Sequence, residues 1–393
     1  MKFLRNLLAA IIGCLIAFGI LFVMFFVFAT LLGNAGDGVV VNENTVLKIS
    51  INEPIYDYYG ADKNDPFAGL FEEGLGLDDI LHAIKVAKTD NRIKGISIKN
   101  NFLLAGLAQT QEIRKALEDF KSSGKTIYAL SDYYAHKDYY LASVADKVFI
   151  NPQGVMDFKG LSSEVLYYKD LQEKSGVKME VIRHGKYKSA VEPFLTNEMS
   201  DENRTQIKEL LNSIWNQMLT DIGRSRKLSI EGLNTIADTL GARNPMMAVN
   251  SGLLDGMRYQ DEYQNDWKEV LGVGEDDDLN VISLSDYIGE SANKNRATGK
   301  NKIAIVFAQG EILYGEGSRD VIGQGRLTRA LRKARENENI KAVVLRVDSP
   351  GGSSLVSDII WREVVLTKEV KPVVVSFGNV AASGGYYLAV GAD

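Results

Sequence analysis

The stretch NIKAVVLRVDSPGGSSLVSDIIWREVVLTKEVKPVVVSFGNVAASGGYYLAVGAD (residues 339–393) gives the main indication of the fold. It resembles an earlier stretch of the same chain. The earlier stretch is RIKGISIKNNFLLAGLAQTQEIRKALEDFKSSGKTIYALSDYYAHKDYYLASVAD (residues 92–146). The two align without a gap at a constant offset of 247 residues (339 against 92), and their apolar runs coincide. We therefore predict that one fold occurs twice in this chain.

Each copy alternates short apolar runs with amphipathic segments. In the second copy, three runs are expected to be buried strands: KIAIVFA (302–308), AVVLRV (342–347) and PVVVSF (372–377). Between the last two, apolar residues at helical spacing predict a helix: Leu355, Val356, Ile359, Ile360 and Val364. Strands that alternate with helices indicate an α/β fold with a parallel sheet.

Composition limits the possible functions. The chain has 393 residues, of which 45% are hydrophobic and 24% charged, so it can bury sizeable cores and two domains are expected. A formal net charge of -6 without a basic cluster argues against a nucleic-acid partner. One cysteine, Cys14, and three scattered histidines supply neither a disulfide framework nor a zinc site. No ATP or dinucleotide motif follows a strand, so no cofactor is expected.

The N-terminus predicts a membrane-spanning helix. Residues 7–32 form a run of 26 residues without a charge. As a helix this run would be roughly 39 Å long, more than the roughly 30 Å of a bilayer's hydrocarbon core. Lys2 and Arg5 precede it and Asp37 follows, which places the N-terminus in the cytoplasm and the rest outside. We expect an uncleaved single-pass anchor that contacts lipid through residues 7–32. A cleaved signal peptide is the alternative.

The two copies differ most at two turns where a strand is expected to lead into a helix. The second copy has DSPGGSS (348–354) and AASGGYY (381–387), where the first has NFLLAGL (101–107) and YAHKDYY (134–140). Ligands of α/β folds bind beyond the carboxyl ends of strands, where helix N-termini offer free N–H groups. Ser383, followed by two glycines, is therefore a candidate nucleophile beside an oxyanion hole. The alternative is that Ser383 only caps a helix.

A serine nucleophile needs a general base. His82 lies in an expected surface helix, and His136 occupies the first-copy position that matches Ser383, so neither is favoured. A lysine among apolar groups is desolvated, which lowers its pKa and lets it act as a base. The residues alone leave three candidates near an expected strand end in VIRHGKYKSAVEPF (181–194): His184, Lys186 and Lys188.

Three motifs together resemble one peptidase family. GKYKSAVEPF (185–194), RVDSPGGS (346–353) and AASGGYY (381–387) follow an N-terminal anchor in this order. This arrangement resembles the signal peptide peptidase SppA family, also called protease IV, in its long two-domain form. The resemblance covers nearly the whole chain after the anchor. It implies a fold similar to the Clp-protease/crotonase group and hydrolysis of remnant signal peptides at the bacterial inner membrane.

The same resemblance implies roles for individual residues. Ser383 would be the nucleophile and Lys188 the general base of a Ser-Lys dyad. The backbone N–H groups of Gly352 and Gly384 would form the oxyanion hole. Substrates would be peptides, no cofactor would be needed, and the protein would assemble into a ring- or dome-shaped homo-oligomer.

The domain organisation follows from the anchor, the repeat and the motifs. We expect an anchor at 1–37, a first Clp/crotonase-like domain with a helical extension at 38–288, a linker at 289–301 and a second such domain at 302–393. Lys188 falls in the first domain and Ser383 in the second. Because Asp393 matches Asp146 in the repeat, the second domain is expected to be incomplete.

Two other classes of function remain open from the sequence. A crotonase-like acyl-CoA enzyme would use the same glycine turns to bind a thioester oxyanion, without Ser383 as nucleophile. A non-catalytic, membrane-tethered scaffold would need no exposed serine at all.

Overall fold

The computed structural model describes residues 2–33, 40–60, 74–274, 276–292, 294 and 299–393. They fall into two compact units, residues 1–42 and 43–393. Parts of the expected anchor (1 and 34–37) and of the expected linker (293 and 295–298) lie outside the described residues.

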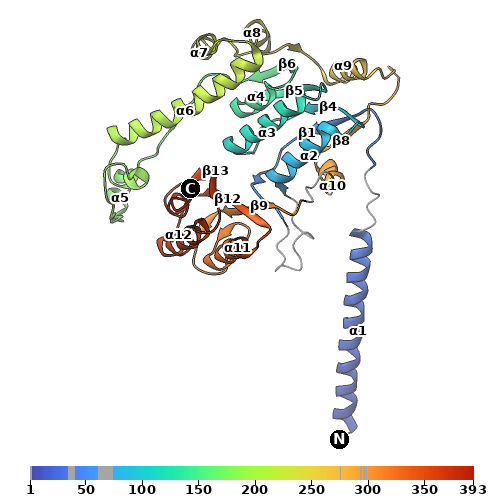
Figure 1. Cartoon of the computed structure of the whole chain (residues 1–393), viewed down its shortest axis with the longest axis vertical. Helices are drawn as coiled ribbons and strands as arrows, with labels where there is room; N and C mark the ends of the chain where they lie inside the picture. Colours follow the sequence, from blue (N-terminus) through green and yellow to red (C-terminus); the bar gives the residue numbers. More distant parts are fainter. Residues whose placement is uncertain (1, 34–39, 61–73, 275, 293, 295–298) are drawn as a thin grey trace. The chain divides into compact units, whose positions relative to one another are not determined.

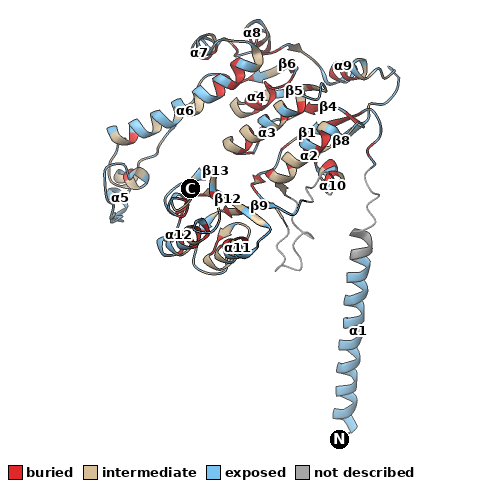
Figure 2. Ribbon diagram, viewed as in Figure 1, coloured by how far each residue is buried: buried red, intermediate tan, exposed pale blue. Residues whose placement is uncertain are grey.

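The first unit contains one long helix, α1 (Lys2–Gly33). Its Lys2–Phe28 stretch is long and apolar enough to cross a membrane, by length and composition. The side chains along this stretch are exposed, as Figure 2 shows in pale blue. A helix that is apolar on all sides matches a membrane span, and a signal sequence near the N-terminus has the same properties.

In the second unit, the larger sheet has the strand order β7-β6-β5-β4-β1-β8 and all its neighbouring strands are parallel (Figure 1). Its strands are β1 (Thr45–Ile49), β4 (Ile93–Ile98), β5 (Thr126–Tyr134), β6 (Lys147–Met156), β7 (Gly256–Met257) and β8 (Val281–Ser283). The parallel α/β architecture predicted from the alternating sequence pattern is confirmed.

Helices complete the core around this sheet. α2 (Leu77–Thr89) and α3 (Leu107–Lys121) pack against each other and bury their apolar faces. From α9 (Gln260–Leu271), the side chains of Tyr263 and Trp267 join a separate apolar cluster with residues of the sheet. An ideal Cβ on Gly95 of β4 would lie 2.6 Å from the Trp267 ring, so the indole packs directly on this glycine.

A smaller parallel sheet follows, with the strand order β13-β12-β9. Its strands are β9 (Lys302–Gln309), β12 (Ile340–Ser349) and β13 (Val373–Ala381). With α11 (Gln324–Glu336) and α12 (Ser354–Lys368), they enclose a core that contains Val343, Leu345, Val356 and Ile360. The three predicted strands and the predicted helix between the last two are thus confirmed, but the expected burial of all three strands is wrong. Ile303 and Ile305 of β9 and Val374 of β13 are exposed, because the described helices that pack on this sheet leave these side chains uncovered.

The bounds of several elements repeat along the chain. α2 and α11 begin and end 247 residues apart (77 and 89 against 324 and 336). The same offset relates α3 to α12 (107 and 121 against 354 and 368). It also relates β5 to β13 (126 and 134 against 373 and 381). The offset of the aligned sequences therefore also relates helices and strands.

The remaining elements are mostly short. The strands are β2 (Ile55–Tyr56), β3 (Leu75–Gly76), β10 (Glu311–Ile312) and β11 (Val321–Ile322). The helices are α4 (His136–Ala142), α5 (Lys169–Ser175), the 3₁₀ helix η1 (Ser189–Phe194), α6 (Asp201–Arg226), α7 (Ile230–Asp238), α8 (Pro245–Asn250), α10 (Leu284–Ser291) and α13 (Gly384–Tyr387).

One sequence expectation in this part of the chain is wrong. The strand expected before His184 does not form. Residues 177–183 adopt no regular secondary structure. A strand needs a neighbour to accept and donate its backbone hydrogen bonds. No described strand pairs with this segment, and its apolar side chains Val177 and Ile182 are exposed.

Residues from both sequence copies meet around β12. The Arg346 guanidinium lies 2.6 Å from Asp57 Oδ2 and 2.6 Å from Glu112 Oε1. Both Arg346 and Asp57 are buried. The rings of Tyr58 and Phe307 stack with their centroids 4.9 Å apart. These contacts therefore hold Asp57 and Tyr58, which precede the first copy, and Glu112, which belongs to it, against the second sheet.

Candidate active site

Two glycine-containing turns lie at the carboxyl ends of neighbouring strands. β12 ends at Ser349, just before Gly351 and Gly352, and β13 ends at Ala381, just before Ser383. The strands are parallel, and Ser349 is paired with Ala381 in their register. The backbone N–H of Ala382 donates to the Ser349 carbonyl over 3.0 Å. The pairing therefore brings both turns to the same edge of the sheet, as the sequence predicts.

The first turn approaches the second so closely that it requires glycine. An ideal Cβ on Gly351 would lie 2.8 Å from Ser383 Cβ and 2.6 Å from Gly384 N. Gly351 also has φ +98° and Gly352 has φ +148°, conformations that residues with a side chain rarely adopt. These glycines are needed for close approach as well as for the turn.

Ser383 has an unusual backbone conformation, with φ 50° and ψ -121°. A non-glycine residue with positive φ is uncommon and marks a turn under strain. Ser383 precedes the four-residue helix α13, but its side chain makes no capping hydrogen bond. The residue is exposed. The helix-cap alternative is therefore not what the structure shows.

Two backbone N–H groups lie beside this serine. Within the described part of the chain, no acceptor takes a hydrogen bond from the N–H of Gly352 or of Gly384. An ideal Cβ on Gly384 would lie 3.4 Å from Gly352 N, so the two groups are neighbours. Strand β10 holds the first turn, because Ile312 N donates to the Gly351 carbonyl and Ser353 N donates to the Ile312 carbonyl. Fixed, unpaired N–H groups next to a hydroxyl can stabilise an oxyanion.

An open depression surrounds Ser383. It is lined by Gly352, Ser354, Leu355, Ser357, Asp358, Ser383, Gly384 and Tyr387. The Tyr387 hydroxyl donates to Asp358 Oδ1 over 2.7 Å, and this hydrogen bond raises the pKa of the tyrosine. Neither a lysine nor a histidine is among the described residues that line the depression.

The three candidate bases lie elsewhere in the described chain. Lys188 immediately precedes η1, is exposed, and its carbonyl accepts a hydrogen bond from Arg183 Nη1 over 3.1 Å. Lys186 forms an ion pair with Glu202 at 3.2 Å, and His184 is exposed. The expected apolar surroundings of Lys188 are therefore not formed in this chain, because the preceding segment is open to solvent.

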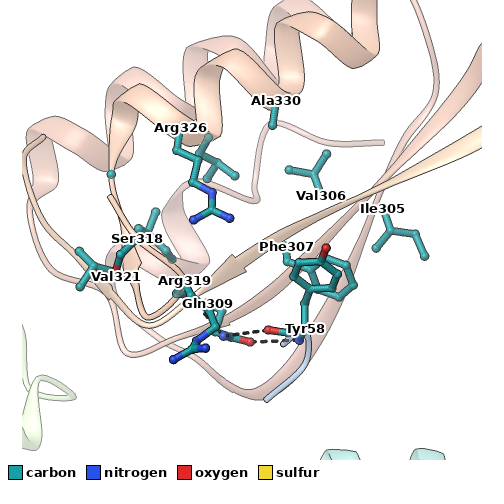
Figure 3. Close-up of a pocket in the computed structure, with 13 residues that line it drawn as sticks. Tyr58, Ile305, Val306, Phe307, Gln309, Ser318, Arg319, Val321, Arg326 and Ala330 are labelled. Atoms are coloured by element: carbon teal, nitrogen blue, oxygen red, sulfur yellow. Dashed lines mark hydrogen bonds between the residues drawn. The ribbon is translucent and has the colours of Figure 1, made fainter. Parts of the chain in front are cut away.

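A second cavity, of about 310 Å³, lies away from these turns (Figure 3). The ring of Tyr58 stacks on Phe307 of β9, and Tyr58 N donates to Gln309 Oε1 over 3.3 Å. None of the candidate catalytic residues lines this cavity.

Sequence reasoning missed two residues that the structure places next to the serine turn, Asp348 and Asn379. The Asn379 Nδ2 group donates to Asp348 Oδ2 over 3.3 Å, and Val380 N donates to Asp348 Oδ1 over 2.9 Å. Asp348 belongs to the DSPGGSS motif, which could have suggested a role. Asn379 lies in an apolar strand pattern with no such indication.

Comparisons with known proteins find similarity to one peptidase family. The model of peptidase family S49 matches residues 119–274 and 366–393, which include Lys188 and Ser383. Protease 4 of Haemophilus influenzae is 36% identical over 325 residues, which cover 80% of this chain and 53% of that protein. Protease 4 of Salmonella typhi is 36% identical over 327 residues, which cover 81% of this chain and 52% of that protein.

A plant relative gives the same result. The chloroplastic serine protease SPPA of Arabidopsis thaliana is 32% identical over 335 residues, covering 84% of this chain and 49% of that protein. The chain thus spans about half the length of the curated relatives it matches. By the family match over residues 119–274 and 366–393 and by these relatives, the chain is similar to proteases of peptidase family S49.

Proposed function

We propose that this chain is part of a membrane-anchored serine endopeptidase in which Ser383 is the nucleophile. The observation that carries the proposal is the strained, exposed Ser383 beside the unpaired N–H groups of Gly352 and Gly384. In acyl transfer, Ser383 Oγ attacks the scissile carbonyl carbon and transfers its proton to a base, while the two N–H groups bind the oxyanion. Collapse of the intermediate expels the amine, and water then releases the acyl group.

The family suggests the other half of a dyad. In this proposal Lys188 is the general base, supported by the GKYKSAVEPF motif and by its place in the S49 match. Lys188 is exposed and is not among the described residues that line the depression around Ser383, so the proposal requires its segment to approach Ser383, within the chain or from a neighbouring copy in a homo-oligomer. His184 and Lys186 are the alternatives in the same segment.

The proposed substrates are cleaved signal peptides in the membrane. Two observations support this class of substrate. The first is the apolar helix α1. The second is a relative from Enterococcus faecium, named a putative signal peptide peptidase SppA, which is 42% identical to this chain over 64 residues. Lys2 and Arg5 favour a cytoplasmic N-terminus, which would place residues after 37 outside the bacterial inner membrane.

We further propose that residues 38–288 and 302–393 are tandem Clp-protease/crotonase-like domains. The repeated element bounds of α2 with α11 and of α3 with α12 support this proposal. An exposed Ser383 in an open depression favours an enzyme over a scaffold.

Labelling with a fluorophosphonate probe tests the nucleophile. The detergent-solubilised chain should be labelled, and Ser383→Ala should lose the label while keeping its circular dichroism spectrum. His136→Gln is the matched control, because His136 is the first-copy counterpart of Ser383, and it should be labelled like the wild type. Equal labelling of Ser383→Ala and wild type would assign the nucleophile to another residue. Failure of both proteins to be labelled would favour a crotonase-like acyl-CoA enzyme, which needs no serine nucleophile.

Peptide hydrolysis tests the base. Arginine keeps the positive charge but does not deprotonate in a useful range, so Lys188→Arg should be as inactive as Lys188→Ala. His184→Gln should retain most of its activity. An active Lys188→Arg beside an inactive His184→Gln would make His184 the base.

A further inference from the structure

The strand that leads to Ser383 contains an irregularity. Val347 of β12 pairs with Phe377 of β13, but Ser349 pairs with Ala381. β12 thus advances two residues while β13 advances four, a register shift of the kind that a β-bulge produces. Bulges redirect side chains and occur next to active sites. Asn379 lies at this shift, four residues before the nucleophile.

The side chain of Asn379 contacts a helix of the first copy. Its Oδ1 accepts hydrogen bonds from Ala108 N (3.1 Å) and Gln109 N (3.4 Å), in the first turn of α3. α3 begins after Gly106, which has no side chain to cap the helix. An ideal Cβ on Gly106 would lie 2.1 Å from Asn379 Cγ. Asn379 therefore occupies the place of the missing cap, although it lies about 270 residues away in sequence.

The other end of the same amide holds the active-site turns. Asn379 Nδ2 donates to Asp348 Oδ2, and Asp348 Oδ1 accepts from Val380 N. Asp348 leads directly into the Gly351-Gly352 turn, and Val380 leads into the serine turn. Both turns are thus linked to the N-terminus of α3 through one side chain.

We propose that Asn379 is a positioning residue that fixes the Ser383 turn against helix α3 of the first copy. Its catalytic consequence, alignment of Ser383 with the N–H groups of Gly352 and Gly384, rests on the proposed function. The structural link itself does not.

Two variants separate this role from simple helix capping. Asn379→Ala removes both the cap and the link. Asn379→Ala combined with Gly106→Ser restores a cap from within α3, because Gly106 has φ -69° and ψ 168°, an extended conformation that suits a serine cap, and the clashing amide is gone. The double variant keeps the helix capped but leaves the two copies unlinked at this point.

Hydrogen exchange of the full chain reads out the two sites separately. In Asn379→Ala, amides of residues 107–111 and 379–388 should both exchange roughly fivefold faster, the effect of losing a typical hydrogen bond. In the double variant, residues 107–111 should recover wild-type protection and residues 379–388 should not. Unchanged exchange of 379–388 in Asn379→Ala, or its recovery in the double variant, would overturn the proposal.

Fluorophosphonate labelling then measures the catalytic consequence. Both variants should be labelled at least fivefold more slowly than the wild type, and wild-type labelling rates in both would overturn a positioning role. Because exchange does not involve the Ser383 hydroxyl, failure of the wild type to be labelled would count against the proposed function alone.

Discussion

At Ser383 the backbone conformation and the exposed hydroxyl have a common cause. The turn is fixed on both sides, by the hydrogen bond from Ala382 N to the Ser349 carbonyl and by that from Tyr387 N to the Ser383 carbonyl. A non-glycine residue held at φ 50° costs about 1–3 kcal/mol. The surrounding turns impose this conformation, and it leaves the hydroxyl directed away from a capping position.

The strain predicts an unusual order of stabilities. Ser383→Gly should be about 1 kcal/mol more stable than Ser383→Ala, because glycine accepts positive φ and alanine does not. This difference already allows for the greater entropy of glycine in the unfolded chain, which lowers the stability of Ser383→Gly. Chemical denaturation of the detergent-solubilised variants measures the difference. Both lack the hydroxyl, so both should be unlabelled. A more stable Ser383→Ala would show that the turn is not strained.

The sequence could locate this serine but not its neighbours from distant segments. The comparison of the two copies pointed to Ser383 and to the two glycine turns, because the first copy lacks the glycine pairs. The choice of Gly352 and Gly384 within these turns came from the family resemblance. The contact of Asn379 with Ala108 spans 271 residues and depends on how the copies pack. The approach of Lys188 to Ser383 would likewise depend on packing, which no local pattern encodes.

At the scale of the elements, periodicity predicted the strands and helices that pair or pack with neighbouring elements. β9, β12, β13 and α12 each contribute apolar side chains to a shared core, as their sequence pattern predicts. The pattern did not predict that Ile303, Ile305 and Val374 of the same sheet are exposed. The segment 177–183 has a similar apolar content, but none of the described strands pairs with it and it is irregular. Periodicity indicates which residues could form a strand, whereas pairing decides whether they do.

The N-terminal turn of α2 provides a pH-dependent element. Burial, followed by repulsion from Asp79, raises the pKa of Asp78 to about 6. The protonated carboxyl is therefore favoured in the folded state, and its contribution to stability is complete below about pH 4 and lost as the pH rises to about 6.

Asp78→Asn should remove this dependence. At pH 7 the variant should be about 1 kcal/mol more stable than the wild type, a value reduced to allow for the solvent-exposed part of the side chain. At pH 4 the difference should vanish. Denaturation at pH 4, 5, 6 and 7 measures it, and a variant that is equally stable or less stable at pH 7 would contradict a raised pKa.

At the scale of the whole second unit, residues before and within the first copy are joined to the second sheet by buried charge as well as by apolar contact. Arg346 binds Asp57, Glu112 and the Ser376 hydroxyl, and Asp57 also accepts a hydrogen bond from Gln109 Nε2 over 3.0 Å. The side chains of Asp57 and Arg346 are 1% and 8% exposed. Charges this far from water are tolerated only when they are paired, so the geometry of this junction is specified strongly.

Removing one partner of that pair should therefore destabilise the junction far more than removing a surface pair. Arg346→Met leaves the Asp57 carboxylate buried without its cation and should lower the free energy of unfolding by about 3–5 kcal/mol. Arg329→Met, which breaks the ion pair with Glu316 between side chains that are 60% and 52% exposed, should cost less than about 1 kcal/mol.

The double variant Asp57→Asn with Arg346→Met decides whether the cost comes from the unpaired charge. Because asparagine leaves no buried carboxylate, the double variant should be more stable than Arg346→Met alone, with a coupling energy of about 2 kcal/mol or more in a double-mutant cycle. Chemical denaturation at pH 7 measures all four proteins. Additive losses would mean that Arg346 contributes through packing rather than through its charge, and this junction would then be held together mainly by apolar contacts such as that between Tyr58 and Phe307.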